Sequence, residues 1–165
     1  GMPNARNIPV SSLHTNIWYH LGLAYYLENN MEKALYAYRE CRKASGNPDN
    51  VVSSSHWLYM ILRRLGRETE ANEILEPITK DMDVIENMAY HNLLLFYKGE
   101  MTLETLTGGS MEASSNAAVD YGIGNWYYYN GNVDEAKRIY SLILEGTSWA
   151  SFGYIAAEAD MSRMK

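Results

Sequence analysis

The sequence predicts an all-α protein built from repeated pairs of helices. Apolar residues recur at intervals of three and four along most of the chain, which is the spacing of one face of a helix. A single pattern of small, apolar and aromatic residues also returns about every 34 residues. Glycine and asparagine stand where the helices should end or begin. Together these observations predict four consecutive helix-turn-helix repeats.

The first repeat spans about residues 15–50 and is the clearest. It contains six pattern residues, namely Trp18, Leu21, Gly22, Tyr25, Ala34 and Tyr38. Trp18, Leu21 and Tyr25 would form an apolar packing stripe on the first helix, and the small Gly22 and Ala34 would let two antiparallel helices approach closely. The second helix would run over about 31–45, with a buried stripe of Ala34, Leu35, Tyr38 and Cys41. Gly46 and Pro48 would stop it.

This spacing resembles the signature of the tetratricopeptide repeat. The resemblance implies a right-handed α-α superhelix, a solenoid of about four helix-turn-helix units with a C-terminal capping helix. In such a fold the first helices of successive repeats line a concave face.

The later repeats follow the same pattern less closely. Their pattern residues are Leu58, Leu62, Gly66, Ala71 and Leu75; Leu95, Gly99, Glu104 and Thr105; and Ile123, Gly124, Tyr127, Gly131, Ala136 and Tyr140. We expect the repeats at about 15–50, 51–82, 83–115 and 116–148, a capping helix at 149–164, and one domain over 11–165 after an N-terminal arm at 1–10.

Helix boundaries are also predicted from capping residues. Asp83 with Glu86, and Asn132 with Glu135, have the spacing of reciprocal N-terminal caps, and Gly146 should end a helix. The second helix of the third repeat, starting near Thr102, should last only a turn or two before Gly108. Residues 107–115 should then form a loop of small residues.

A narrower resemblance covers the downstream three quarters of the chain. Its residues are Trp57, Leu58 and Tyr59; Phe96, Tyr97, Lys98 and Gly99 leading to Glu104 and Leu106; and Gly124, Tyr127, Tyr128, Gly131, Asp134 and Ala136. These are similar to the repeats of bacterial lipoproteins of the new-lipoprotein-I type. That resemblance implies an envelope adaptor for cell-wall enzymes, although the chain shows no lipid-bearing N-terminal cysteine.

Aromatic residues and two arginines lie opposite the expected packing stripes, where the resemblance places the groove. The predicted groove residues are Tyr19, Leu23, Tyr26, His56, Met60, Arg63, Arg64, Phe96, Tyr97, Tyr121, Asn125 and Tyr128. Aromatic rings and arginine suit a peptide with an apolar anchor and a carboxylate. The alternative is that some of these tyrosines pack between repeats.

No catalytic constellation emerges from the sequence. The four histidines include no pair four residues apart, and the single cysteine has no partner for a zinc site, so no metal or cofactor is expected. Cys41 lies on a buried helical stripe, which favours a packing residue over a nucleophile. The sequence therefore predicts a protein that is not an enzyme.

Charge and hydropathy exclude two further classes of partner. The net charge of −6 repels phosphate backbones, and the one basic cluster, Arg63, Arg64 and Arg67, has the character of a solvated helix end. No apolar stretch is long enough to span a membrane. We therefore expect neither nucleic acid nor a membrane span.

The sequence thus predicts a bacterial-type scaffold or adaptor that binds a protein or peptide. A homodimer closed by the aromatic surface of the first or last helix is the open alternative. Gly1 before Met2 resembles the scar of tag cleavage, which makes Met2 the natural start and the cytoplasm the expected compartment. If an export signal was removed instead, the periplasm or envelope is expected.

Overall fold

The structure is a computed structural model that describes residues 4, 6–109 and 116–164. Those residues form nine helices that pack in pairs, without a sheet, so the all-α prediction is confirmed. Two compact units are present, Gly1–Glu100 (unit 1) and Met101–Lys165 (unit 2). The solenoid and the single domain over 11–165 stay predictions. Part of the expected arm (1–3 and 5) and most of the expected 107–115 loop lie outside the described residues.

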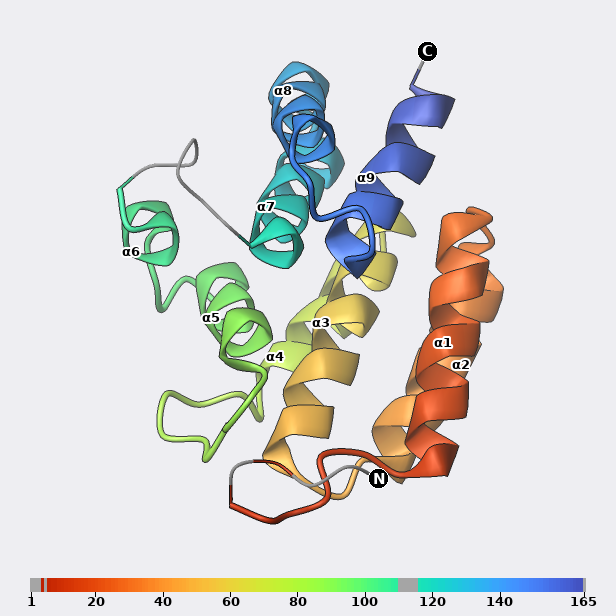
Figure 1. Cartoon of the computed structure of the whole chain (residues 1–165), viewed down its shortest axis with the longest axis vertical. Coiled ribbons are helices and arrows are strands. Elements are labelled where there is room, and N and C mark those ends of the chain that lie inside the picture. The colour runs from red at the N-terminus through yellow and green to blue at the C-terminus, as the bar shows by residue number, and fades with distance from the viewer. Residues whose placement is uncertain (1–3, 5, 110–115, 165) are drawn as a thin grey trace. The chain divides into compact units, whose positions relative to one another are not determined.

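Unit 1 is organised around one central helix (Figure 1). Helix α1 (Leu13–Leu27) pairs with α2 (Met31–Ala44), and α3 (Pro48–Arg64) pairs with α4 (Glu68–Leu75). Helix α5 (Met88–Tyr97) then packs on α3, which also contacts α1 and α2. Because neighbours surround α3, every residue from 52 to 62 is buried.

Short polar side chains begin the first and third helices. The Ser12 hydroxyl accepts a hydrogen bond from the backbone N–H of Thr15 at 3.1 Å, and the Thr15 hydroxyl accepts one from the N–H of Ser12 at 2.9 Å. This reciprocal cap satisfies donors that a helix start leaves without partners. The Asn47 side chain caps α3, whose first turn holds Pro48. Pro48 therefore starts a helix as well as following the end of one.

Helices α1 and α2 approach each other most closely at Gly22, as its small size predicts. A Cβ on Gly22 would lie 2.7 Å from two ring atoms of Tyr38. The Tyr38 ring is fully buried and stacks on Trp57 of α3, with the ring centroids 5.8 Å apart. Since neither ring has space to move aside, this contact requires a glycine in α1.

The stripe expected to bury α1 was predicted on the wrong face. Leu21 is exposed, and Trp18 and Tyr25 are partly exposed, whereas the buried residues of α1 are Thr15, Gly22, Leu23 and Tyr26. The reason is that α1 packs on α3 as well as on α2, which turns its deepest face toward Trp57. The predicted stripe of α2 is confirmed, because Ala34, Leu35, Tyr38 and Cys41 are all buried.

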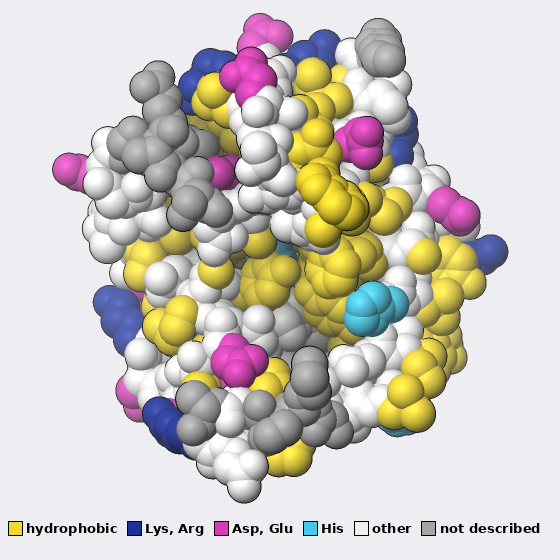
Figure 2. Space-filling model, viewed as in Figure 1, with side chains coloured by type: hydrophobic (Ala, Val, Ile, Leu, Met, Phe, Trp, Pro, Cys, Tyr) yellow, Lys and Arg dark blue, Asp and Glu magenta, His cyan; other side chains and the backbone are white. Residues whose placement is uncertain are grey.

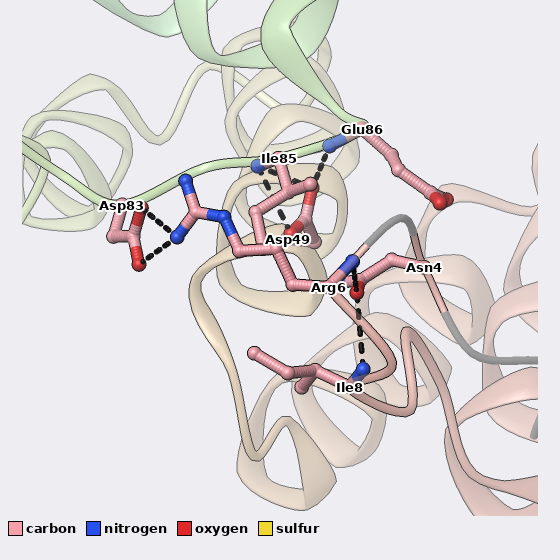
Figure 3. A network of polar contacts seen from close by, with 7 residues as sticks. All are labelled: Asn4, Arg6, Ile8, Asp49, Asp83, Ile85 and Glu86. Atoms are coloured by element: carbon pink, nitrogen blue, oxygen red, sulfur yellow. Dashed lines mark hydrogen bonds and ion pairs between the residues drawn. The ribbon is translucent and has the colours of Figure 1, made fainter.

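A buried carboxylate connects the start of α3 with the segment that precedes α5 (Figure 3). Asp49 accepts hydrogen bonds from the backbone N–H groups of Glu86 and Asn87, both at 2.8 Å, and from that of Ile85 at 3.2 Å. Nearby, the Arg6 guanidinium pairs with Asp83 at 2.8 Å on the surface. Asp49 thus fixes where α5 begins relative to α3.

Unit 2 contains a short helix and a three-helix group. Helix α6 (Leu103–Thr107) ends at Gly108, whose φ of 64° lies in the left-handed region that suits glycine, so the expected short helix is confirmed. Helices α7 (Ala117–Tyr129), α8 (Val133–Glu145) and α9 (Phe152–Arg163) all contact one another. The terminal helix starts at residue 152, three residues later than expected, after its cap Ser151.

The pair α7 and α8 repeats the close contact of α1 and α2. A Cβ on Gly124 would lie 2.6 Å from the ring of Tyr140, which is fully buried. Gly124 and Tyr140 have the same spacing in the sequence as Gly22 and Tyr38. Two helix pairs distant in the sequence therefore use the same packing device.

The predicted caps of the later helices had mixed outcomes. The Asn132 side chain accepts from the N–H of Glu135 at 3.3 Å, and Gly146 caps the end of α8, as expected. The cap predicted at Asp83 and Glu86 is wrong, since α5 begins at Met88. Glu86 instead donates its backbone N–H to Asp49, and Asp83 pairs with Arg6.

Candidate functional site

Aromatic side chains from α1, α3 and α5 form a connected cluster in unit 1. The indole N–H of Trp57 in α3 donates to the Tyr19 hydroxyl of α1 at 2.7 Å. The Tyr19 hydroxyl in turn lies 3.5 Å from that of Tyr90 in α5. Three helices that are not consecutive in the sequence are thus joined through their aromatic side chains.

His56 lies in the middle of this cluster. Its ring stacks on Tyr90 and Tyr97 of α5, with centroid distances of 4.8 and 5.9 Å, and meets Trp57 edge to face at 5.6 Å. Burial lowers the pKa of His56 to about 3, because a charged imidazole would lose its hydration there. His56 is therefore a neutral packing residue at physiological pH.

The phenols around His56 are uncharged as well. Burial is the largest cause that raises the pKa of Tyr19, Tyr90 and Tyr97 above the ordinary value. All three side chains nevertheless keep part of their surface exposed. The cluster is therefore a neutral group of aromatic rings that reaches the surface in part, with the Tyr19 and Tyr90 hydroxyls close to each other within it.

Two arginines lie at the C-terminal end of α3, next to the cluster. The Arg63 guanidinium lies 3.3 Å from the Tyr59 hydroxyl and 3.2 Å from the exposed carboxylate of Glu68. The guanidinium of Arg64 stands over the ring of Tyr26, 5.0 Å from its centroid. A hydrogen bond to a tyrosine hydroxyl thus holds Arg63 beside the cluster, and a contact with a ring face holds Arg64 there.

The twelve predicted groove residues divide evenly between buried and partly exposed positions. The buried ones are Leu23, Tyr26, His56, Met60, Tyr121 and Asn125, and the partly exposed ones are Tyr19, Arg63, Arg64, Phe96, Tyr97 and Tyr128. The first six are buried and do not form a surface. The reason is that the first helices contact neighbours on more than one side, so they bury more residues than a single packing stripe would. Peptide binding at the remaining residues stays a prediction.

The structure brings some of these residues together and explains others by packing. Tyr19 and Tyr97 both belong to the cluster in unit 1. In unit 2, the Tyr121 hydroxyl donates to the buried Asp160 carboxylate at 2.8 Å, and Asp160 pairs with Arg163 at 2.7 Å. Tyr121 therefore anchors α9 on α7.

The sequence-based list of groove residues missed Tyr90. This residue contacts both Tyr19 and His56, and it stands seven positions before Tyr97. Seven residues are close to two helical turns, so Tyr90 and Tyr97 share one face of α5. That spacing is the signal that identifies Tyr90 as a member of the cluster.

Three further features concern metal binding, the cysteine and membrane-spanning helices. Among the residues that the structure describes, no group of three or more His, Cys, Asp or Glu side chains is placed to hold a metal ion. Cys41 is buried, as a packing residue should be, and burial raises the pKa of its thiol to about 11. Over the same described residues, no helix has both the length and the apolar character needed to cross a membrane.

Comparison with known protein families found one match, to the tetratricopeptide repeat, over residues 17–47. This segment covers most of α1 and α2, including Gly22 and Tyr38. Searches of curated proteins and of solved structures found no match to the chain. The chain therefore contains a tetratricopeptide repeat, a helix pair that serves in protein interaction and is typically non-catalytic.

Proposed function

From the tetratricopeptide repeat at residues 17–47, we propose that this protein is a non-catalytic scaffold or adaptor that binds a peptide or a segment of another protein. The observation that carries the proposal is that the first helix of this repeat contributes Tyr19 to a cluster shared with α3 and α5. In proteins built from such helix pairs, successive first helices form an extended binding surface.

The proposed contact surface is the aromatic face, defined as the partly exposed residues Tyr19, Tyr90, Phe96, Tyr97, Arg63 and Arg64. Tyrosine rings give a large contact area at low entropic cost, and arginine recognises carboxylates. In the Arg63–Glu68 pair the carboxylate side chain is 66% exposed, whereas that of Arg63 is 16% exposed, so Glu68 holds the guanidinium from the solvent side. An acidic group of the bound peptide can therefore replace Glu68.

The proposal extends to the repeat organisation of the chain. Gly124, Ala136 and Tyr140 have the spacing of Gly22, Ala34 and Tyr38, and both pairs of helices pack through a glycine against a tyrosine ring. This supports α7 and α8 as a second repeat of the same kind, within a solenoid of about four. The envelope role, the bacterial source and the compartment stay predictions of the sequence.

Selection from a display library of random peptides on the immobilised chain tests the proposal. We expect enriched peptides that combine an apolar anchor with an acidic group. Arg64→Ala should weaken their binding by about tenfold or more, equivalent to about 1.4 kcal/mol. The matched control is Arg39→Ala, which removes the same charge from α2, where Arg39 pairs with Glu70 at 2.7 Å.

The Arg39→Ala variant should bind the selected peptides as the parent chain does. The proposal is contradicted if no peptide is enriched. It is also contradicted if both arginine variants lose affinity equally, because the effect then follows net charge and not the aromatic face.

A further inference from the structure

The outer face of α1 carries an uncovered apolar stripe. Leu13, Ile17 and Leu21 follow one another at every fourth position, and they are 76%, 55% and 36% exposed. Residues four apart lie on one face of a helix, so the three side chains form a continuous row. Figure 2 shows hydrophobic side chains along the edge of unit 1 where Figure 1 draws α1 and α2.

The stripe continues onto α2 through an aromatic contact. Trp18, which is partly exposed, meets Tyr36 edge to face with ring centroids 5.9 Å apart, and Tyr36 is 61% exposed. The α1 patch is defined here as Leu13, Ile17, Leu21, Trp18 and Tyr36. With about 150–250 Å² for a large side chain, the exposed fractions amount to roughly 500 Å². Exposed apolar patches of about 300–600 Å² are often interaction sites.

Helix α1 is apolar on both of its faces. It contains no Asp, Glu, Lys or Arg from residue 13 to residue 27. One face packs on α2 and α3, and the opposite face is the α1 patch. Exposed polar residues, His14, Asn16 and His20, flank this row, but no element of the described chain covers the row itself, which is the character of an interaction site.

We propose that a second copy of this chain covers the α1 patch, with the two α1 helices antiparallel about a two-fold axis at Ile17. In that arrangement Leu13 lies opposite Leu21 of the partner subunit, so each half of the stripe meets the other half. The pattern is thus self-complementary, as a two-fold interface requires.

Charge favours this occupant over a charged partner. Each copy carries a net charge of −6, so two copies repel wherever acidic surfaces meet. The uncharged outer face of α1 is a surface on which they can approach without like-charge contacts.

The size of the patch sets the strength of the dimer. Stable interfaces bury about 800 Å² on each partner, and smaller ones belong to weak or transient complexes. With roughly 500 Å² of apolar surface plus a polar rim that includes His14, the α1 dimer falls in the weak class. We therefore expect monomer and dimer to exchange, with dimer formation dependent on concentration.

Sedimentation of the full chain over a range of concentrations tests this dimer. The parent chain should shift from monomer to dimer as its concentration rises, and Ile17→Asp should remain monomeric. The matched control is Val133→Asp, which puts the same charge on an apolar residue of α8 that is 38% exposed. Circular dichroism checks that both variants stay folded, since both positions face solvent.

A parent chain that stays monomeric throughout overturns the proposal. A dimer that persists in Ile17→Asp, or that dissociates in Trp149→Ser, also overturns it, because the contact then lies elsewhere; Trp149 is 73% exposed in unit 2. Binding of the selected peptides should be unchanged in Ile17→Asp, which separates this inference from the proposed function.

The two-fold geometry has its own test. In Ile17→Cys the new thiols of two copies should face each other across the axis and form a disulfide-linked dimer under mild oxidation. Cys41 is buried and does not compete. Val133→Cys serves as the control and should stay monomeric. Equal cross-linking of the two cysteine variants contradicts an interface centred on Ile17.

Discussion

Replacing Gly22 with alanine tests the close approach of α1 to α2. The added Cβ would lie 2.7 Å from two ring atoms of Tyr38, and that ring is confined by Trp57 on one face and by Tyr19 at its edge. Overpacking of this kind costs about 1–3 kcal/mol. Alanine returns about 1 kcal/mol through its higher helix propensity. Because the ring cannot yield, the overpacking cost should be near its upper end, about 3 kcal/mol. We therefore expect the unfolding free energy to fall by a net amount of about 2 kcal/mol.

The measurement is urea or thermal unfolding followed by circular dichroism. A loss of this size should lower the Tm by about 4–8 °C in a chain of this length. Gly46→Ala is the control, because no atom lies within 4 Å of a Cβ at that position. We expect the control to change stability by less than about 0.5 kcal/mol. Equal stability of the two variants would refute the packing argument.

Three further predictions concern buried polar groups. The pKa of His56 is lowered to about 3 in the folded chain, whereas an unfolded histidine has a pKa of about 6.5. As the pH falls below about 6.5, the unfolded chain therefore binds a proton that the folded chain does not bind. Unfolding titrations should therefore show the unfolding free energy declining toward pH 4, with His56 contributing up to about 1.4 kcal/mol per pH unit. In His56→Phe this contribution to the pH dependence should vanish. An identical pH dependence of the variant and the parent chain would contradict the burial of His56. Asp49→Ala should lower the unfolding free energy by about 3 kcal/mol, since backbone donors at residues 85–87 lose a charged acceptor. Hydrogen exchange at those amides should accelerate, and unchanged rates would argue against the link between α3 and the start of α5. Cys41, with its pKa raised to about 11, should react with a thiol reagent at pH 8 on the order of 100-fold more slowly in the folded chain than in urea; equal rates would show that the thiol is accessible.

Local pattern was enough to predict the helices of the first repeat. The spacing of Gly22, Ala34 and Tyr38 identified the helix pair, and the structure places the glycine against the tyrosine ring. This works because a close helix contact constrains a few residues strongly, and their spacing follows from helix geometry. The short α6 was predicted for a similar reason, since glycine at Gly108 ends it.

Burial could not be predicted from one helix at a time. Leu23 and Tyr26 were expected to face a groove, yet both are buried because α1 also packs on α3. The periodicity of a helix indicates that one face is apolar, but α1 is apolar on both faces, so its own pattern cannot say which face is covered. That decision depends on contacts between elements far apart in the sequence.

The candidate site was predicted only in part for the same reason. The sequence pattern predicts Tyr19 and Tyr97 as site residues, but it does not predict Tyr90, and it places on the groove surface His56, which is buried. His56 is held between Tyr90 and Tyr97, rings that the sequence places more than thirty positions away. The start of α5 was also misplaced, because Asp49 binds the backbone of Glu86, where a local cap had been expected.

The most direct test of a peptide-binding aromatic face is to map a bound peptide by nuclear magnetic resonance. A selected peptide is titrated into the isotope-labelled chain, and the shifts of backbone and indole signals are followed. We predict that the largest changes occur in α1, α3 and α5, including Tyr19, Tyr97 and the indole N–H of Trp57, which donates to Tyr19. Changes confined to α2, α4 or unit 2 would contradict the proposed face.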